Sequence, residues 1–223
     1  MCFPHAGGSA GLFHSWTTWL APDIELVAVQ YPGRQERIED PFPDSIESLA
    51  DQITEQLAPF LDLPLSLFGH SMGSALVYEV AGRLEGRCDL TTLFVSGSPA
   101  PHDGPPGTLH LTGDDELVAW ALELGSAASQ AYTVPELRAL LMPSLRADRR
   151  LVDVYRPARV TPLRTRMIAF GGDADPGCSP GELASWQKAT TEELEVRVFP
   201  GDHFYLQSRT AELVLEINEF VRR

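Results

Sequence analysis

The fold is decided by residues 65–84, LSLFGHSMGSALVYEVAGRL. This stretch begins with an apolar run typical of a buried strand and ends in a segment whose apolar residues have helical spacing. Between the two lies Gly69-His70-Ser71-Met72-Gly73, which matches the pattern G-x-S-x-G. A tight strand-to-helix turn of this kind pushes a serine hydroxyl out of the sheet, and the flanking glycines remove side chains that would clash. We therefore predict that Ser71 is a nucleophile and that the N–H of Met72 faces a developing oxyanion.

The same pattern occurs a second time, as Gly7-Gly8-Ser9-Ala10-Gly11. Ordinary Gly and Ser frequencies give roughly a one-in-ten chance match in a chain of this length, so the pattern alone does not select a serine. The context does. Ser71 directly follows a strand pattern and leads into a helix, whereas Ser9 lies in a glycine-rich loop. Ser71 is therefore preferred over Ser9.

Strand and helix patterns alternate along the rest of the chain. Short apolar runs bounded by Gly and Pro predict strands at residues 26–31, 65–68, 93–96, 166–170 and 194–199. Helical periodicity predicts helices at residues 45–60, 74–84, 114–124, 135–155, 180–189 and 208–223. Asp44 and Glu47 are the expected N-cap pair of the first helix. The alternation predicts an α/β fold, with a mostly parallel sheet covered by helices on both faces and ligands beyond the carboxyl ends of its strands.

Two segments depart from this alternation. The chain opens with Met1-Cys2-Phe3, only the tail of a strand, so we expect further residues before Met1. Residues 99–161 form a connection much longer than the ~30 residues of a whole βαβ unit. It begins with a loop rich in proline and glycine and continues through two helical patterns. We predict a core of residues 1–98 and 162–223 and an inserted helical lid of residues 99–161. The alternative is an ordinary pair of packing helices.

Composition and charge exclude several classes of protein. With 43% hydrophobic and 22% charged residues, the 223-residue chain is close to the average folded domain. No apolar run approaches the ~18 residues that span a bilayer, and the N-terminus lacks a secretory pattern. A net charge of −14 opposes binding to nucleic acid and to anionic membranes. Cys2, Cys88 and Cys178 lack metal-ligand spacing, so we expect no metal site and a reducing cytoplasm.

A serine hydroxyl is a poor nucleophile unless a positioned base takes its proton. In α/β folds with a serine on such an elbow, the catalytic residues follow along the chain in the order serine, acid, histidine. His203 is the one histidine after the last predicted strand; the alternative is an ordinary surface-loop histidine. The acid should follow the strand ending at Phe170, where Asp173 and Asp175 are available. Asp175 is preferred because G-x-x-D after this strand is the usual presentation of the acid. Asp173 is the alternative, and otherwise a turn residue that bonds its own loop.

The second oxyanion donor is expected in the loop after the first strand, Pro4-His5-Ala6-Gly7-Gly8. Its glycines allow backbone N–H groups to face a ligand. Ala6 is the preferred donor, and a plain glycine-rich turn is the alternative.

Five motifs in this order resemble the type II thioesterases that accompany polyketide synthases and nonribosomal peptide synthetases. They are CFPHAGG (2–8), YPGR (31–34), FGHSMG (68–73), GDADP (172–176) and GDHF (201–204). The resemblance implies an α/β-hydrolase fold with a helical lid, no metal and no dissociable cofactor. It assigns the triad roles to Ser71, Asp175 and His203 and the oxyanion roles to Ala6 and Met72. It also implies an editing role, the hydrolysis of stalled or aberrant acyl groups from the phosphopantetheine arm of acyl or peptidyl carrier proteins.

The charge is unevenly distributed along the chain. Between Arg138 and Arg166 lie eight of the 17 basic residues and only two acidic ones, Asp148 and Asp153, a formal charge of about +6. Because carrier proteins are typically acidic, this basic stretch is a hypothetical docking face; alternatively, its arginines pair with acidic helices of the chain. Three other functions stay open: a generic carboxylesterase or lipase, a cyclising terminal domain of a synthase, and a non-catalytic carrier-binding homologue.

Overall fold

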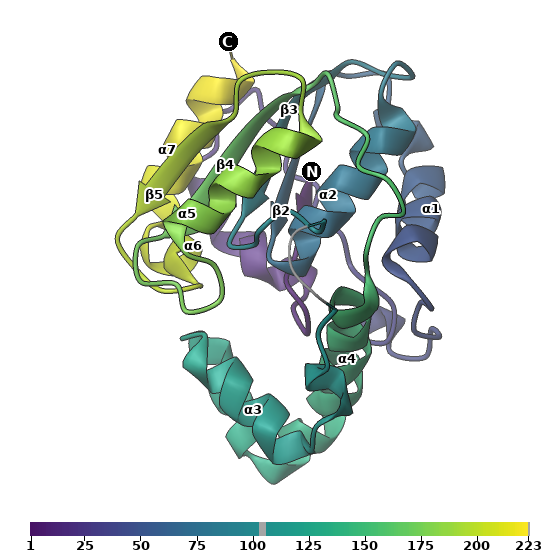
Figure 1. Cartoon of the computed structure of the whole chain (residues 1–223), viewed down its shortest axis with the longest axis vertical. Helices are drawn as coiled ribbons and strands as arrows, with labels where there is room; N and C mark the ends of the chain where they lie inside the picture. The colour runs from purple at the N-terminus through teal and green to yellow at the C-terminus, as the bar shows by residue number, and fades with distance from the viewer. Residues whose placement is uncertain (103–105, 223) are drawn as a thin grey trace.

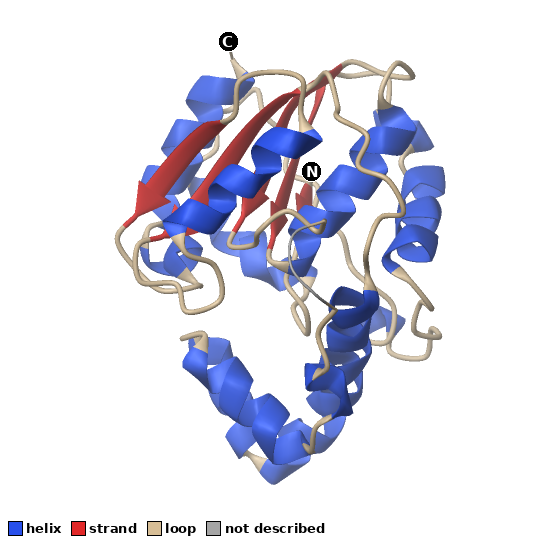
Figure 2. Cartoon of the chain, in the orientation of Figure 1, coloured by secondary structure: helices blue, strands red, loops and turns tan. Residues whose placement is uncertain are grey.

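The computed structural model describes residues 1–102 and 106–222 (Figure 1). Five strands form its sheet: β1 (Cys2–Phe3), β2 (Leu65–His70), β3 (Leu90–Ser96), β4 (Arg166–Gly172) and β5 (Glu195–Phe199). They lie in the order β1-β2-β3-β4-β5, and each neighbouring pair is parallel. Helices cover both faces of this sheet (Figure 2). The α/β fold predicted from the alternating pattern is confirmed.

Each face of the sheet has its own hydrophobic core. One core packs β-strand residues against α1 (Ile46–Gln56), α2 (Met72–Leu84) and α5 (Pro180–Leu183). The other packs them against the 3₁₀ segment η1 (Ala10–Thr18), α6 (Tyr205–Ser208) and α7 (Thr210–Val221). Successive residues of β3 alternate between the two: Leu93 and Val95 belong to the first core, Phe94 to the second. Burial on both faces explains why the strands read as continuous apolar runs.

The run at residues 26–31 does not form a strand, contrary to the prediction. It makes a single bridge, between Ala28 and Cys2. There the Cys2 N–H donates to the Val27 carbonyl over 2.8 Å, and the Val29 N–H donates to the Cys2 carbonyl over 2.9 Å. Because β1 has two residues, it offers this run no longer ladder to join.

Several helix boundaries also differ from the predictions. The N-cap of α1 is Ser45 rather than Asp44; its hydroxyl accepts the Ser48 N–H over 3.0 Å in a capping box. The predicted helix at 45–60 ends at Gln56, and a 3₁₀ turn, η3 (Ala58–Phe60), follows. The predicted helix at 180–189 continues after α5 as the 3₁₀ segment η6 (Ala184–Ala189). The predicted helix at 208–223 is instead the α6–α7 pair, which begins at Tyr205 and is interrupted at Arg209; Arg223 lies outside the described residues.

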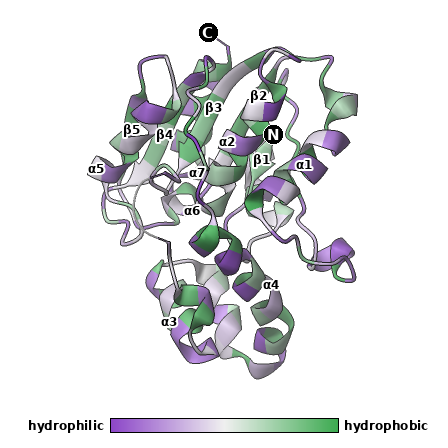
Figure 3. Ribbon diagram, turned by 45° about the vertical axis from the view of Figure 1, so that its right-hand side comes forward, coloured by the Kyte–Doolittle hydropathy of each residue, from purple (hydrophilic) through white to green (hydrophobic). Residues whose placement is uncertain are grey.

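The long connection at residues 99–161 forms a small helical unit. It contains the 3₁₀ turn η4 (Leu109–Leu111), α3 (Asp114–Glu123), the 3₁₀ segment η5 (Ala127–Thr133) and α4 (Pro135–Val154). Figures 1 and 3 show α3 and α4 standing beyond the sheet, at the end toward which the strand arrows point. The unit has a hydrophobic cluster of its own, made by Leu117, Val118, Ala121, Tyr132, Met142 and Leu145. Gly104 and Pro105, in the predicted Pro- and Gly-rich loop, lie outside the described residues. That the helical unit of residues 99–161 acts as a lid stays a prediction.

No helix in the described part of the chain is both long and apolar enough to cross a bilayer.

Candidate active site

Ser71 lies on the sharp turn between β2 and α2. Its φ of +55° and ψ of −116° are rare for a residue with a side chain, and such strain clusters at functional sites. The flanking glycines permit this turn. A Cβ on Gly69 would lie 2.1 Å from the Gly73 carbonyl oxygen, and one on Gly73 would lie 2.2 Å from the Phe3 carbonyl oxygen. Residues larger than glycine would therefore clash at positions 69 and 73, as the G-x-S-x-G pattern predicts.

Asp175 and His203 meet at the carboxyl ends of β4 and β5. Asp175 Oδ2 lies 2.8 Å from His203 Nδ1, and both residues are buried. The second carboxylate oxygen of Asp175 accepts the Gly177 N–H over 2.7 Å. These two hydrogen bonds fix the orientation of the carboxylate and thus of the imidazole ring that it holds.

Asp173 has a different task from the one predicted. Its carboxylate accepts the Gly201 N–H over 2.9 Å, and its own N–H donates to the Phe199 carbonyl over 2.9 Å. Asp173 therefore bonds the loop after β5, which carries His203, rather than its own loop. The structure pairs His203 with Asp175 and uses Asp173 to anchor the base of the histidine loop.

The Nε2 atom of His203 is buried and has no hydrogen-bond partner among the described residues. His203 and Ser71 line the same two cavities. A base that is not yet bonded to its nucleophile is common in substrate-free sites, where this contact tightens on binding. Nε2 is thus the ring atom available to Ser71 or to a leaving group.

Two further histidines pack around His203, and the sequence reasoning did not foresee this. The ring centroids of His70 and His203 are 4.7 Å apart, and those of His5 and His70 are 6.0 Å apart. Burial, followed by the neighbouring His203, lowers the pKa of His5 to about 3 and that of His70 well below its usual range. Both rings are therefore neutral near pH 7 and pack against His203 without adding charge. The motif positions of His5 and His70 were the sole signal for them in the sequence.

The loop after β1 forms a tight turn that offers few free donors. The Gly8 N–H donates to the His5 carbonyl over 2.9 Å, and Gly7 has a φ of +75°, as the third residue of a type II turn requires. The Gly7 N–H is also taken, because it donates to Asp148 Oδ2 over 2.8 Å. Ala6 N–H has no acceptor in the described part of the chain. The Ala6 N–H is therefore available to a ligand.

Met72 supplies a second N–H that has no acceptor among the described residues. It is the first residue of α2, where the backbone N–H groups of a helix have no partner within the helix and the helix dipole favours negative charge. Ser9, the rejected nucleophile, is the N-cap of η1, and its hydroxyl accepts a hydrogen bond from Gln35 Nε2 over 2.9 Å. It does not lie on a strand-to-helix turn.

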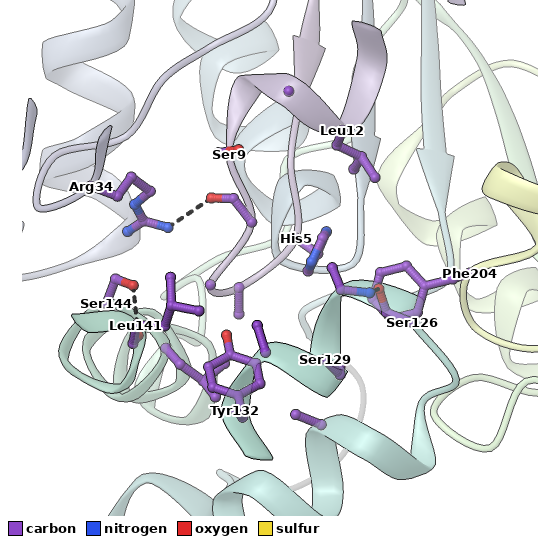
Figure 4. Close-up of a pocket in the computed structure, with 18 of the residues that line it drawn as sticks. His5, Ser9, Leu12, Arg34, Ser126, Ser129, Tyr132, Leu141, Ser144 and Phe204 are labelled. Atoms are coloured by element: carbon purple, nitrogen blue, oxygen red, sulfur yellow. Dashed lines mark hydrogen bonds between the residues drawn. The ribbon is translucent and has the colours of Figure 1, made fainter. Parts of the chain in front are cut away.

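Two cavities meet at Ser71 and His203. The larger has a volume of about 720 Å³, and both the core and the 99–161 unit line it. Figure 4 shows Ser129 and Tyr132 of this unit opposite His5 and the loop that carries Ser9. The smaller cavity, about 280 Å³, is lined in part by Met72, Gly97 and Gly177. Trp120 of α3 and Leu124, the C-cap residue of this helix, line both cavities, so the nucleophile lies near the end of α3 where the cavities meet.

The chemistry open to this arrangement is acyl transfer to a serine. No group of three or more His, Cys, Asp or Glu side chains in the described residues is arranged to hold a metal ion. An imidazole held by a carboxylate, a serine on an elbow and two N–H donors are the parts that such a reaction needs.

A model of the Thioesterase domain family matches residues 1–221. The chain belongs to this thioesterase family. The family and its relatives therefore support a hydrolase that acts on thioesters, as the motifs predicted.

Among its relatives are two Streptomyces proteins. A probable cadicidin biosynthesis thioesterase of Streptomyces griseus is 38% identical over 207 residues, which is 92% of this chain and 57% of that protein. Thioesterase PikA5 of Streptomyces venezuelae is 33% identical over 222 residues, 98% of this chain and 79% of that protein. The chain thus spans little more than half the length of the first of these relatives.

The solved structure of BorB, a type II thioesterase from the borrelidin biosynthetic cluster, matches with a TM-score of 0.89. It is 38% identical, and the match covers 99% of this chain and 91% of that chain. The predicted resemblance to type II thioesterases and the predicted α/β-hydrolase fold are both confirmed.

Proposed function

We propose that this protein is a stand-alone serine thioesterase that removes stalled or aberrant acyl groups from the phosphopantetheine arm of acyl or peptidyl carrier proteins. These carriers would belong to a polyketide or nonribosomal peptide synthase. The observation that carries the proposal is the buried His203–Asp175 pair beside the elbow serine, Ser71, in a thioesterase-family chain. The similarity to BorB over nearly its whole length supports the same biosynthetic setting.

The proposed reaction proceeds through an acyl-serine. Asp175 accepts the Nδ1–H of His203, so Nε2 is the basic nitrogen and takes the proton from the Ser71 hydroxyl. The serine oxygen attacks the thioester carbonyl carbon, and the N–H groups of Ala6 and Met72 stabilise the oxyanion. Collapse expels the pantetheine thiol, which receives the proton from His203. A water molecule activated by His203 then hydrolyses the ester. Every proton transfer runs through the imidazole, and we propose that no metal or dissociable cofactor takes part.

The basic stretch supports carrier docking over a smaller area than the sequence suggested. Several of its arginines form ion pairs within the chain: Arg138–Asp115, Arg146–Asp114, Arg149–Asp153 and Arg166–Glu195. Arg150 is exposed and lies one helical turn beyond Arg146 on α4, and both residues line a surface cavity beside this helix. We therefore narrow the docking proposal to this face of α4, centred on Arg150.

A charge reversal tests the docking face. Arg150→Glu should raise KM for an acylated carrier protein and leave KM for a small acyl thioester unchanged, because Arg150 lines neither of the two cavities that meet at Ser71. Arg159→Glu is the matched control, since Arg159 is exposed in the same stretch but lies outside α4. Equal effects of Arg150→Glu on both substrates would reject docking at this face.

Cys2, Cys88 and Cys178 are all unpaired, which supports the cytoplasm as the proposed compartment.

The function itself is tested with a holo carrier protein loaded with a short acyl group. Intact-mass spectrometry follows loss of the acyl group in the presence of the wild-type chain and of Ser71→Ala, with a p-nitrophenyl ester as a second substrate. We expect rapid clearance by the wild type and a loss of several orders of magnitude in Ser71→Ala. Ester cleavage with an untouched carrier would instead identify a generic carboxylesterase. Clearance that persists in Ser71→Ala would overturn the mechanism.

A further inference from the structure

A buried ion pair joins α4 to the core directly behind the Ala6 turn. Arg34 Nη1 and Nη2 lie 2.6 and 2.8 Å from the two carboxylate oxygens of Asp148. Asp148 is fully buried and Arg34 is 5% exposed. Burial lowers the pKa of Arg34, but the hydrogen bonds and charge of Asp148 outweigh it, and the net shift is upward. The Arg34 guanidinium is therefore charged at neutral pH, and the pair is sheltered from solvent.

The pair holds the backbone of the turn as well as itself. Asp148 Oδ2 accepts the Gly7 N–H over 2.8 Å, and Arg34 Nη1 donates to the Gly8 carbonyl over 3.0 Å. On the other side of Ala6, the Tyr31 hydroxyl donates to the Pro4 carbonyl over 3.0 Å. Backbone groups on both sides of Ala6, at Pro4 and at Gly7 and Gly8, are thus bonded to side chains.

The 99–161 unit also packs against the turn. A Cβ on Gly7 would lie 2.8 Å from the Tyr132 hydroxyl of η5 and 3.0 Å from Leu145 Cδ1 of α4. With α4 and η5 in this position, a residue larger than glycine would clash at position 7. Figure 4 shows Arg34 and Tyr132 on different sides of this loop.

We propose that Arg34 and Asp148 are positioning residues that hold the Ala6 N–H at the oxyanion, so that the oxyanion hole is complete only when α4 is seated on the turn. The inference rests on the proposed function, because it takes Ala6 as an oxyanion donor. Neither residue touches the reacting atoms. Each acts through the Gly7–Gly8 backbone, and Asp148 contributes this contact from the predicted lid.

Asp148→Asn is the first test. Three N–H groups point at the two oxygens of Asp148, and an amide has one acceptor oxygen, so at least one of them would face an NH₂ group. We expect kcat for a p-nitrophenyl ester to fall by about 10²-fold, the typical effect of losing one oxyanion donor, while KM changes by less than about threefold.

A trifluoromethyl ketone distinguishes positioning from general damage. The Ser71 oxygen adds to its carbonyl carbon, the serine proton passes to His203, and the ketone oxygen becomes an anion in the hole. Asp148→Asn should weaken this inhibitor by the same factor as it lowers kcat. An inhibition constant equal to that of the wild type would overturn the inference.

Asp153→Asn is the matched control. Asp153 is also a buried carboxylate of α4 that accepts several N–H groups, from the backbone and Nδ1 of His110 and from Nε and Nη2 of Arg149, but it does not contact the turn. We expect it to lower the melting temperature and leave inhibitor binding within about threefold of the wild type, since its bonds stay within the 99–161 unit. Equal losses in Asp148→Asn and Asp153→Asn would mean that the effect is destabilisation of α4.

The double variant Arg34→Met/Asp148→Leu removes both charges and fills the space with apolar atoms. Such replacements often restore the stability that a single change loses. We expect recovery of the melting temperature without recovery of kcat; recovery of both would show that the pair is merely structural.

The ester and the inhibitor need no carrier protein, so these results are independent of the editing role. Failure to clear acyl carriers, with esterase activity intact, overturns the proposed function alone. A wild-type chain that forms no ketone adduct overturns both.

Discussion

Replacing Asp175 by asparagine tests the assignment of the acid, and the structure dictates the outcome in detail. The two oxygens of Asp175 accept from two donors, His203 Nδ1 and the Gly177 N–H. The Gly177 N–H can only donate, so the amide oxygen of the variant must turn toward it. The amide NH₂ then faces His203 Nδ1, and the ring must carry its proton on Nε2 instead. In that tautomer His203 cannot accept the proton of Ser71.

The magnitude follows from this change of tautomer. A carboxylate-to-amide change in a triad lowers kcat by about 10⁴-fold while leaving the geometry intact, which corresponds to about 5.5 kcal/mol in the activation barrier. KM should change little, because Asp175 is buried behind His203 and is not among the residues that line the two cavities. The assay is the steady-state hydrolysis of an acyl carrier protein and of a p-nitrophenyl ester. The tautomer itself is read from the ¹⁵N chemical shifts of the His203 ring.

Asp173→Asn is the matched control for this prediction. Its amide oxygen can still accept the Gly201 N–H, so we expect kcat within about tenfold of the wild type. A wild-type rate in Asp175→Asn together with a 10⁴-fold loss in Asp173→Asn would refute the reasoning and make Asp173 the acid.

Two further predictions concern stability. Gly73→Ala would place a Cβ 2.2 Å from the Phe3 carbonyl oxygen, so it should lower the free energy of unfolding by about 3 kcal/mol or more. Gly82→Ala, in the same helix with no atom within 4 Å of its Cβ, should instead raise it by about 0.5–1 kcal/mol; urea titration measures both, and a stable Gly73→Ala would contradict the packing at the elbow. Burial lowers the pKa of His5 and His70 in the folded state, so the unfolded chain binds more protons than the folded chain below about pH 6.5. The free energy of unfolding therefore decreases as the pH is lowered through this range. The fall between pH 7.5 and pH 5 should be smaller by about 2 kcal/mol in His5→Gln than in the wild type, and an unchanged fall would show that His5 is not buried as a neutral ring.

The element order and the elbow were predictable because they depend on local patterns. A strand buried on both faces, such as β3 at Leu93, Phe94 and Val95, reads as an apolar run, and the turn at Ser71 must have small neighbours on both sides. Asp175 and His203 were predictable for a related reason. Parallel strands end at one edge of a sheet, so residues that follow β4 and β5 meet there whatever the packing of the helices.

Other features depended on partners that the local pattern does not reveal. The apolar run at 26–31 reads as a strand, but it pairs with β1 at a single bridge because β1 has two residues. The N-cap of α1 is Ser45 and not the predicted Asp44, because the Ser45 hydroxyl is the group that reaches the Ser48 N–H. Asp173 bonds the loop after β5, since β4 and β5 are neighbours in the sheet.

The amino-acid sequence by itself determined the fold class, the family and the residues that are candidates for catalysis, because motifs and periodicity are local properties. The tertiary structure alone decided what surrounds them. His5 and His203 lie in separate loops and His70 ends β2; the three rings pack together because the carboxyl ends of the parallel strands lie at one edge of the sheet. Arg34 and Asp148 lie 114 positions apart, and in the sequence Asp148 is merely an acidic residue within a basic stretch. The pairing of Arg34 with Asp148 depends on how α4 docks on the Ala6 turn. No local periodicity in the sequence encodes that contact.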